Sequence, residues 1–246
     1  MTRADALISF EYFPPKTPAG RDKLLTETTP ALQAVGPAFF SVTYGAGGST
    51  RDNTAGTVSE LKARGVDVAP HLSFGQDDEA AVAELLDSYR AMGIDRLVAL
   101  RGDLPSGTGA GTRLVYANEL VRFVREHSGD HFTIEVAAYP EIHPQAESYD
   151  SDLNYLKGKF TAGADSAITQ YFFNPDAYFY FLERCRAIGI DQPIFPGIMP
   201  ITNYANLARF SHNCGAEIPR WICRRLEAFA DDRDSIREFG AEVVTR

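Results

Sequence analysis

Cysteine is scarce in this chain, and long apolar runs are missing. The three cysteines, Cys185, Cys214 and Cys223, form no Cys-x-x-Cys pair, and their odd number argues against a disulfide framework. No run approaches the roughly 20 apolar residues of a membrane helix, and no charged start followed by an apolar segment resembles a leader peptide. These absences predict a cytoplasmic protein that is neither inserted in a membrane nor processed.

Positive charge is also in short supply. The net charge of -9 leaves no basic stripe to neutralise a phosphate backbone, so we expect a small-molecule partner rather than a nucleic acid. With 246 residues, 44% of them hydrophobic, the chain can bury one sizeable core. We therefore expect a single domain over residues 1–246, since α/β barrels of about 250 residues commonly form one domain.

Seven apolar, β-rich runs alternate with helical patterns. In segments between them, such as Asp77–Met92 and Arg113–His127, apolar residues return every three or four positions, which is typical of an amphipathic helix. This alternation predicts a parallel sheet. The expected strands are Leu7–Phe13, Phe39–Gly45, Val68–Phe74, Arg96–Arg101, Phe132–Tyr139, Ser166–Phe173 and Pro193–Met199.

A short Gly-x-Asp string recurs just before four of these strands. It starts at Gly65, Gly93, Gly163 and Gly189, and its spacings of 28, 70 and 26 residues correspond to one, two and one βα units. Each glycine can adopt the left-handed conformation that ends a helix. The string predicts that one kind of helix-to-strand turn is reused along the chain.

The polar residues favour a closed barrel over an open, doubly wound sheet. Strands this apolar must be covered on both faces, which either architecture achieves. Chemically interesting side chains follow the carboxyl end of nearly every strand, as at the mouth of a barrel, whereas an open sheet gathers them at one switch point. The predicted fold class is α/β, a TIM-type (βα)8 barrel.

The eighth strand of that barrel is apparently missing from the given chain. Three helical patterns, Asn203–Ser211, Arg220–Phe229 and Asp232–Val244, follow the seventh run, and the chain stops at Arg246. An open barrel would expose two strand edges, which is an association hazard. We expect either a truncated sequence or a gap covered by a terminal helix or a partner, such as a second copy in a homo-oligomer.

Glu11 is the first candidate for chemistry. It lies between aromatic residues in Ser-Phe-Glu-Tyr-Phe-Pro-Pro, at the end of the first strand. Burial beside those rings would disfavour the charged carboxylate and raise its pKa, which is the profile of a general acid. The alternative is a carboxylate that only pairs with Arg101 or Lys16.

Two further strand ends carry signals for a bound phosphate. The glycine-rich turn in residues 41–50 ends the second strand and can bring backbone amides close to a ligand. Arg101, Gly102 and Asp103 follow the fourth strand, and an arginine fork suits a diphosphate. The Gly/Ser-rich stretch 106–111 then fits a mobile active-site loop. The alternatives are a plain tight turn and a salt-bridged pair.

Two histidines and one amide complete the candidates. His71 and His143 follow the third and fifth strands, but no His-x-His or His-x-x-x-His spacing presents two ligands together, so we expect no metal site. Gln170 ends the sixth strand, where its amide needs both donor and acceptor partners. A ligand ring or an internal network would supply them.

Taken together, the strings at these strand ends resemble those of the methylenetetrahydrofolate reductase family. Their order and spacing match across nearly the whole chain, and seven strings in order are highly specific. They are Ser-Phe-Glu-Tyr-Phe-Pro-Pro, Ser-Val-Thr-Tyr-Gly-Ala, Ala-Pro-His-Leu, Val-Ala-Leu-Arg-Gly-Asp-Leu-Pro, Ala-Ala-Tyr-Pro-Glu-Ile-His-Pro, Ile-Thr-Gln-Tyr-Phe-Phe and Pro-Gly-Ile-Met-Pro.

The resemblance implies a barrel that holds FAD without a Rossmann fingerprint and takes electrons from NADH or NADPH. It identifies Glu11 as the catalytic acid and Asp103 as a residue shared between flavin and folate. The implied cofactor-binding positions are Thr43, Tyr44, Ala46, His71, Arg101, Gly102, Asp103, Tyr116, Ala117, Tyr139, His143, Ala146, Asp152 and Lys159. The implied substrate-binding positions are Asp103, Gln170, Asn206 and Phe210.

The implied reaction converts 5,10-methylenetetrahydrofolate to 5-methyltetrahydrofolate by ping-pong hydride transfer through FAD, a step of one-carbon metabolism and methionine biosynthesis. Glu11 would protonate the leaving nitrogen so that the ring opens to an iminium cation, which Asp103 would stabilise. Two alternatives stay open. One is a flavin barrel of the proline dehydrogenase type, and the other is a non-catalytic barrel module if the missing strand abolishes flavin binding.

Overall fold

The structure, a computed structural model, describes residues 7–44, 51–74, 79–101 and 116–245. The chain divides into two compact units. Unit 1 comprises Met1–Val136 and Ala162–Ala164, and unit 2 comprises Ala137–Thr161 and Asp165–Arg246. In the described part of the chain, no helix combines the length and the apolar character needed to cross a membrane.

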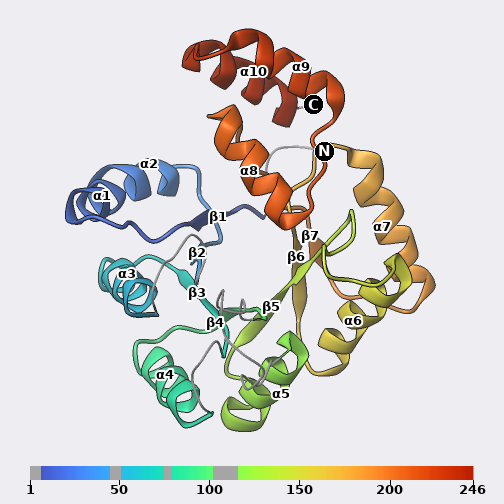
Figure 1. Cartoon of the computed structure of the whole chain (residues 1–246). Helices are drawn as coiled ribbons and strands as arrows, with labels where there is room; N and C mark the ends of the chain where they lie inside the picture. The colour runs from blue at the N-terminus through green and yellow to red at the C-terminus, as the bar shows by residue number, and fades with distance from the viewer. Residues whose placement is uncertain (1–6, 45–50, 75–78, 102–115, 246) are drawn as a thin grey trace, which may run out of the picture. The chain divides into compact units, whose positions relative to one another are not determined.

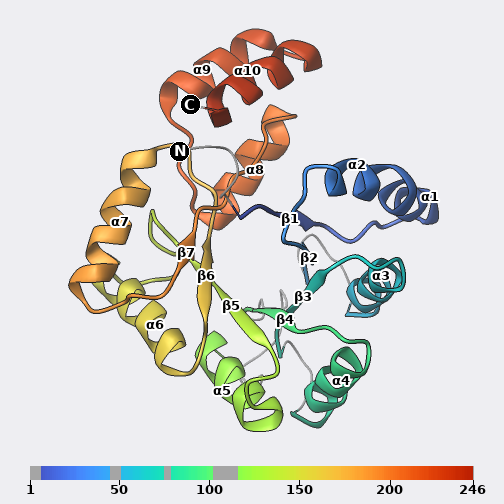
Figure 2. The same ribbon diagram turned by 180° about the vertical axis from the view of Figure 1, so that it is seen from behind.

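Unit 1 is built on parallel strands that pair in the order in which they follow one another in the chain. The strands are β1 (Ser9–Tyr12), β2 (Phe39–Val42), β3 (Val68–Leu72), β4 (Arg96–Ala99) and β5 (Thr133–Ala138), whose last two residues belong to unit 2. The helical segments are α1 (Pro18–Lys23), η1 (Leu24–Thr28, a π-helix), α2 (Thr29–Gln33), α3 (Arg51–Ala63), α4 (Glu79–Ala91) and α5 (Ala117–Ser128). Helices α3, α4 and α5 lie on one side of these strands (Figures 1 and 2).

Unit 2 holds the end of β5, the parallel pair of β6 (Ser166–Thr169) and β7 (Ile194–Phe195), and five helices among its described residues. The helices are α6 (Tyr149–Thr161), α7 (Pro175–Ala187), α8 (Tyr204–Cys214), α9 (Arg220–Phe229) and α10 (Arg233–Thr245). The last three form a group at the end of the chain (Figures 1 and 2) and share a buried apolar cluster that includes Leu207, Ile222 and Phe239.

The sequential strand order confirms the predicted α/β class. The order runs from β1 to β7, and no eighth strand occurs among the described residues. Every expected strand is present but shorter than predicted, because the apolar runs extend past the last ladder hydrogen bonds. The reused turn is also confirmed, since Gly65, Gly93, Gly163 and Gly189 all have positive φ angles, of 75°, 71°, 115° and 79°.

Strand register sorts the side chains of unit 1 onto two faces. Glu11 pairs with Ser41, and Ser41 pairs with Ala69, so these three side chains share one face. The opposite face carries the aromatic neighbours of Glu11, because the rings of Phe10 and Tyr12 pack on Phe40 at centroid distances of 5.8 and 5.2 Å. The face that carries Glu11 is therefore the one on which a site can form.

Candidate active site

The carboxyl ends of β1, β2 and β3 place three candidate residues on one face of unit 1. Thr43 and His71 lie two positions beyond Ser41 and Ala69, so their side chains point to the same side as Glu11. Thr43 and His71 are 4% and 6% exposed, whereas the Glu11 side chain keeps 47% of its surface exposed. Unit 1 thus carries two buried polar groups and one accessible carboxyl group on the same face.

Glu11 and His71 form a close pair in which the carboxyl group titrates near pH 7 and the imidazole is neutral at that pH. Glu11 Oε2 lies 3.7 Å from His71 Nε2. Burial raises the pKa of Glu11 to about 7 and lowers the pKa of His71 to about 3. The carboxyl group is thus surrounded closely enough to favour its protonated form although part of its side chain stays accessible.

The sequence predicted the direction of the Glu11 pKa shift from burial beside Phe10, Tyr12 and Phe13, and the structure places two of these rings, Phe10 and Tyr12, on the opposite face. Phe10 and Tyr12 face away from the carboxyl group and pack on Phe40, so their rings do not bury it. The titratable group that the structure places next to the Glu11 carboxyl group is the neutral imidazole of His71 rather than Arg101 or Lys16. A general acid with a pKa near neutrality is the chemistry that this geometry supports.

Three buried polar atoms at the carboxyl ends of β2 and β3 have no hydrogen-bond partner among the described residues. They are Thr43 Oγ1, His71 Nε2 and the Oγ of Ser73, the residue that follows β3. Thr43 satisfies its backbone, because its N–H donates to the Tyr12 carbonyl and its carbonyl accepts from Thr54. Since unpaired buried polar groups are costly, these atoms fit the polar edge of a bound group such as the FAD that the resemblance implies.

The other cofactor positions of unit 1 are described only in part. Tyr44 and Arg101 are half-buried just beyond β2 and β4, and Ala117 begins α5 as a buried residue. Tyr116 precedes it, is 47% exposed and donates its backbone N–H to Glu119. Ala46, Gly102, Asp103 and the loop 106–111 lie outside the described residues. Within the described ranges, no three His, Cys, Asp or Glu side chains gather in a way that could hold a metal ion.

In unit 2, the loop after β5 brings Tyr139, His143 and Asp152 together. The Tyr139 and His143 rings meet edge to face at 4.6 Å, and the Asp152 carboxylate accepts the His143 backbone N–H at 2.8 Å. Ala146 donates its backbone N–H to the His143 carbonyl. Lys159 on α6 donates to the Ala137 carbonyl at the end of β5. Five predicted cofactor positions thus belong to one connected segment of unit 2.

The predicted substrate positions gather around β6 and α8. The Gln170 backbone N–H donates to the Ala138 carbonyl, and the Gln170 side-chain oxygen accepts from the Tyr171 N–H. The Tyr171 ring stacks on Phe210 at 6.1 Å. Asn206 is exposed in the first turn of α8, where its side-chain oxygen accepts from Arg209. An amide and an aromatic ring therefore lie on adjoining elements of unit 2.

Two residues of the site region were missed by sequence reasoning. Ser73 carries no motif. Ile142 has a φ of 73°, a left-handed conformation that is strained for a β-branched residue. The strained residue directly precedes His143. The same loop is also held by the Glu141 carboxylate, which accepts a hydrogen bond from the Glu217 backbone N–H. No sequence signal identifies either residue, because isoleucine itself disfavours the conformation that it adopts.

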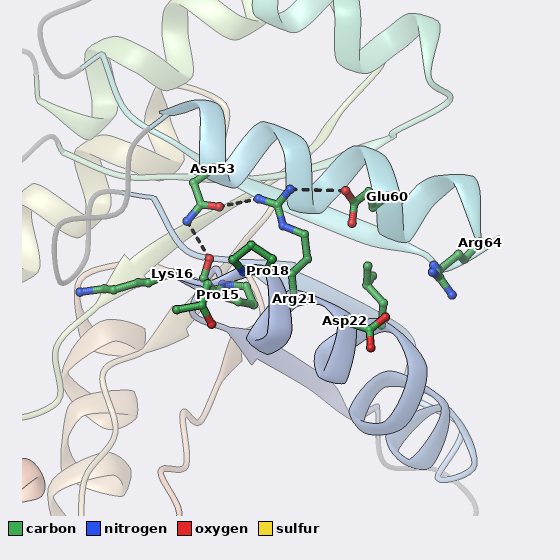
Figure 3. Close-up of a pocket in the computed structure, with 10 residues that line it drawn as sticks. Pro15, Lys16, Pro18, Arg21, Asp22, Asn53, Glu60 and Arg64 are labelled. Carbon is green, nitrogen blue, oxygen red and sulfur yellow. Dashed lines mark hydrogen bonds and ion pairs between the residues drawn. The ribbon is translucent and has the colours of Figure 1, made fainter.

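A groove of about 780 Å³ between α1 and α3 lies on the helical side of unit 1 (Figure 3). Three of its lining side chains are linked to one another: Arg21 contacts Asn53 at 2.7 Å and Glu60 at 3.4 Å, and Asn53 also donates to the Pro15 carbonyl. These contacts tie α1 to α3. Because these contacts connect two helices, they give the groove a structural role, and the strand ends remain the candidate site.

Comparison with known proteins identifies relatives over the whole chain. The family model for methylenetetrahydrofolate reductase matches residues 1–246. The 5,10-methylenetetrahydrofolate reductase of Pectobacterium carotovorum is 40% identical over 238 residues, which cover 96% of this chain and 78% of that protein. Methylenetetrahydrofolate reductase (NADH) 1 of Arabidopsis thaliana is 39% identical over 251 residues, covering 96% of this chain and 42% of that protein.

A solved structure supports the fold. A Clostridium thermocellum protein that binds two copies of 5-methyl-5,6,7,8-tetrahydrofolic acid superposes with a TM-score of 0.69. The match covers 97% of this chain and 82% of that one, at 17% sequence identity. At this identity the likeness concerns the fold alone, and it confirms the predicted α/β barrel class.

Proposed function

Because the chain belongs to the methylenetetrahydrofolate reductase family, we propose that it reduces 5,10-methylenetetrahydrofolate to 5-methyltetrahydrofolate with NADH or NADPH, by a ping-pong reaction through bound FAD. The observation that carries the proposal is Glu11, an accessible carboxyl group with a pKa of about 7 beside unpaired polar atoms. The use of a nicotinamide as the electron donor is supported by the Arabidopsis relative, whose name specifies NADH.

In this reaction, the chain itself supplies the proton that opens the folate ring. Methylenetetrahydrofolate must open its five-membered ring before it accepts hydride, and the leaving nitrogen must be protonated for the ring to open. Glu11 donates this proton from its carboxyl group, directly or through a water molecule. His71 stays neutral and so places no positive charge beside Glu11, which would otherwise favour loss of the proton. FAD, when bound, supplies the hydride transfer.

Binding and charge stabilisation fall to the remaining residues. Thr43 and His71 would hold the flavin, when it is bound, through side-chain atoms that lack partners among the described residues. Asp103, which lies outside the described residues, stabilises the cationic form of the folate. For unit 2, the family resemblance implies that Gln170 would bind folate and nicotinamide through its amide group and that Phe210 would stack on them.

A spectrum of the purified protein tests the proposal first. We expect an absorption band near roughly 450 nm from the bound flavin, bleaching of the band by NADH or NADPH without oxygen, and its return when methylenetetrahydrofolate is added. A colourless folded protein that does not take up FAD would indicate a non-catalytic module. Bleaching by proline, with no return on adding the folate, would indicate an enzyme of the proline dehydrogenase type.

The pH dependence of the two half-reactions is a second test. Because burial raises the pKa of Glu11 to about 7, the carboxyl group is mostly protonated below that pH and mostly ionised above it. We expect the rate of folate reduction to fall about tenfold per pH unit well above pH 7, while flavin reduction by the nicotinamide does not show this decline. Stopped-flow flavin absorbance from pH 6 to 9 measures both rates. Parallel decline of both would argue against Glu11 as the acid.

A further inference from the structure

Ser73 follows β3 directly and is 3% exposed, and the direction of its side chain can be inferred from that of Phe74. The orientation follows from its neighbour, because the Phe74 ring packs edge-on against Phe123 of α5 at 5.4 Å. Successive residues of an extended chain point to opposite sides. Ser73 therefore points away from α5, to the face that carries His71.

The Ser73 hydroxyl lacks a hydrogen-bond partner in the part of the chain that the structure describes. It shares this property and this face with Thr43 and His71, which the family resemblance places against the flavin. Two residues along an extended chain span about 6.6 Å, so Ser73 lies roughly that far beyond His71. That distance is shorter than the three fused rings of a flavin. One ligand can therefore contact both residues.

We propose that Ser73 is a further cofactor-binding residue, whose hydroxyl forms a hydrogen bond with the bound flavin. The inference rests on the proposed function, because it takes the flavin to lie at the carboxyl ends of β1 to β3. Its physical basis is that a hydroxyl already removed from water loses no further solvation when the ligand arrives. The hydrogen bond then increases the affinity for FAD, while the unpaired hydroxyl lowers the stability of the flavin-free protein.

The test uses the full chain freed of flavin and titrated with FAD, with binding followed by quenching of flavin fluorescence. Ser73→Ala is expected to weaken FAD binding about tenfold, while Ser73→Thr, which keeps a hydroxyl, binds more tightly than the alanine variant. The matched control is Ser128→Ala. Ser128 is another buried serine of unit 1, but it ends α5 and so lies toward the amino ends of the strands. This control is expected to bind FAD as the parent chain does.

Melting of the flavin-free protein separates a binding role from a structural one. Removing an unpaired buried hydroxyl should leave the melting temperature unchanged or raise it. A lower melting temperature for flavin-free Ser73→Ala would mean that the hydroxyl supports the fold, which would overturn the inference. Unchanged FAD affinity in Ser73→Ala would overturn it as well while leaving the proposed function intact. A parent chain that binds no FAD would overturn both.

Discussion

Glutamine in place of Glu11 is expected to slow folate reduction by about 100- to 10,000-fold, the usual contribution of a general acid. The amide has nearly the shape of the carboxyl group but cannot transfer a proton to the leaving nitrogen. FAD binding and flavin reduction by NADH or NADPH need no such proton, so both should stay close to those of the parent chain. Anaerobic stopped-flow absorbance of the flavin measures each half-reaction separately.

Glu60→Gln is the matched control for this substitution. Glu60 is about as exposed as Glu11, with 43% of its side-chain surface accessible, but it pairs with Arg21 in the groove between α1 and α3. The same chemical change there should leave both half-reactions unaltered. Loss of both half-reactions together in Glu11→Gln would contradict the assigned role, because it would point to a damaged flavin site.

The stability of Glu11→Gln follows from the sign of the pKa shift. The Glu11 pKa is raised from 4.5 to about 7 in the folded protein, so any stabilisation from its proton is complete below about pH 4.5 and is lost as pH rises through about 7. Glutamine is neutral at every pH. The variant should therefore be at least as stable as the parent chain at pH 8, and lost activity there would not reflect unfolding.

Alanine at Gly197 is expected to destabilise unit 2 by about 2 to 4 kcal/mol. Gly197 follows β7, and its backbone N–H donates to the Thr169 hydroxyl at 2.9 Å. A Cβ at this position would lie 2.1 Å from the Thr169 carbonyl oxygen and 3.2 Å from its carbonyl carbon. These are backbone atoms at the end of β6, so no side-chain rotation can relieve the clash, and the two strand ends must separate.

Urea unfolding followed by tryptophan fluorescence measures this effect. The chain has a single tryptophan, Trp221, whose ring contacts Phe239 in the apolar cluster of unit 2. Gly158→Ala is the control, since Gly158 lies inside α6, where a methyl group would meet no atom within 4 Å beyond the backbone of its own helix. This control should gain about 0.5 to 1 kcal/mol from helix propensity. Equal unfolding midpoints for the two variants would refute the clash.

The sequence predicted regular elements well where the pattern repeats within a few residues. The helix Arg220–Phe229 begins and ends where its apolar periodicity does. The segment from Pro18 to Gln33 was not predicted, because it contains two prolines and three threonines within a helical run that includes a π-helix. Long-range contacts hold it in place: Tyr12 donates to Thr29, and Arg21 contacts α3.

By itself, the sequence determined the alternation of strands and helices, the reused Gly-x-Asp turn and the family resemblance. Each of these depends on residue types at short, regular spacings. Only the tertiary structure decided that Glu11 lies beside His71 and apart from Phe10 and Tyr12, that Phe74 packs on α5 and that Gly197 lies against the end of β6. These contacts depend on how strands that are about 30 or more residues apart are aligned with one another. The residues within a single strand do not determine that register.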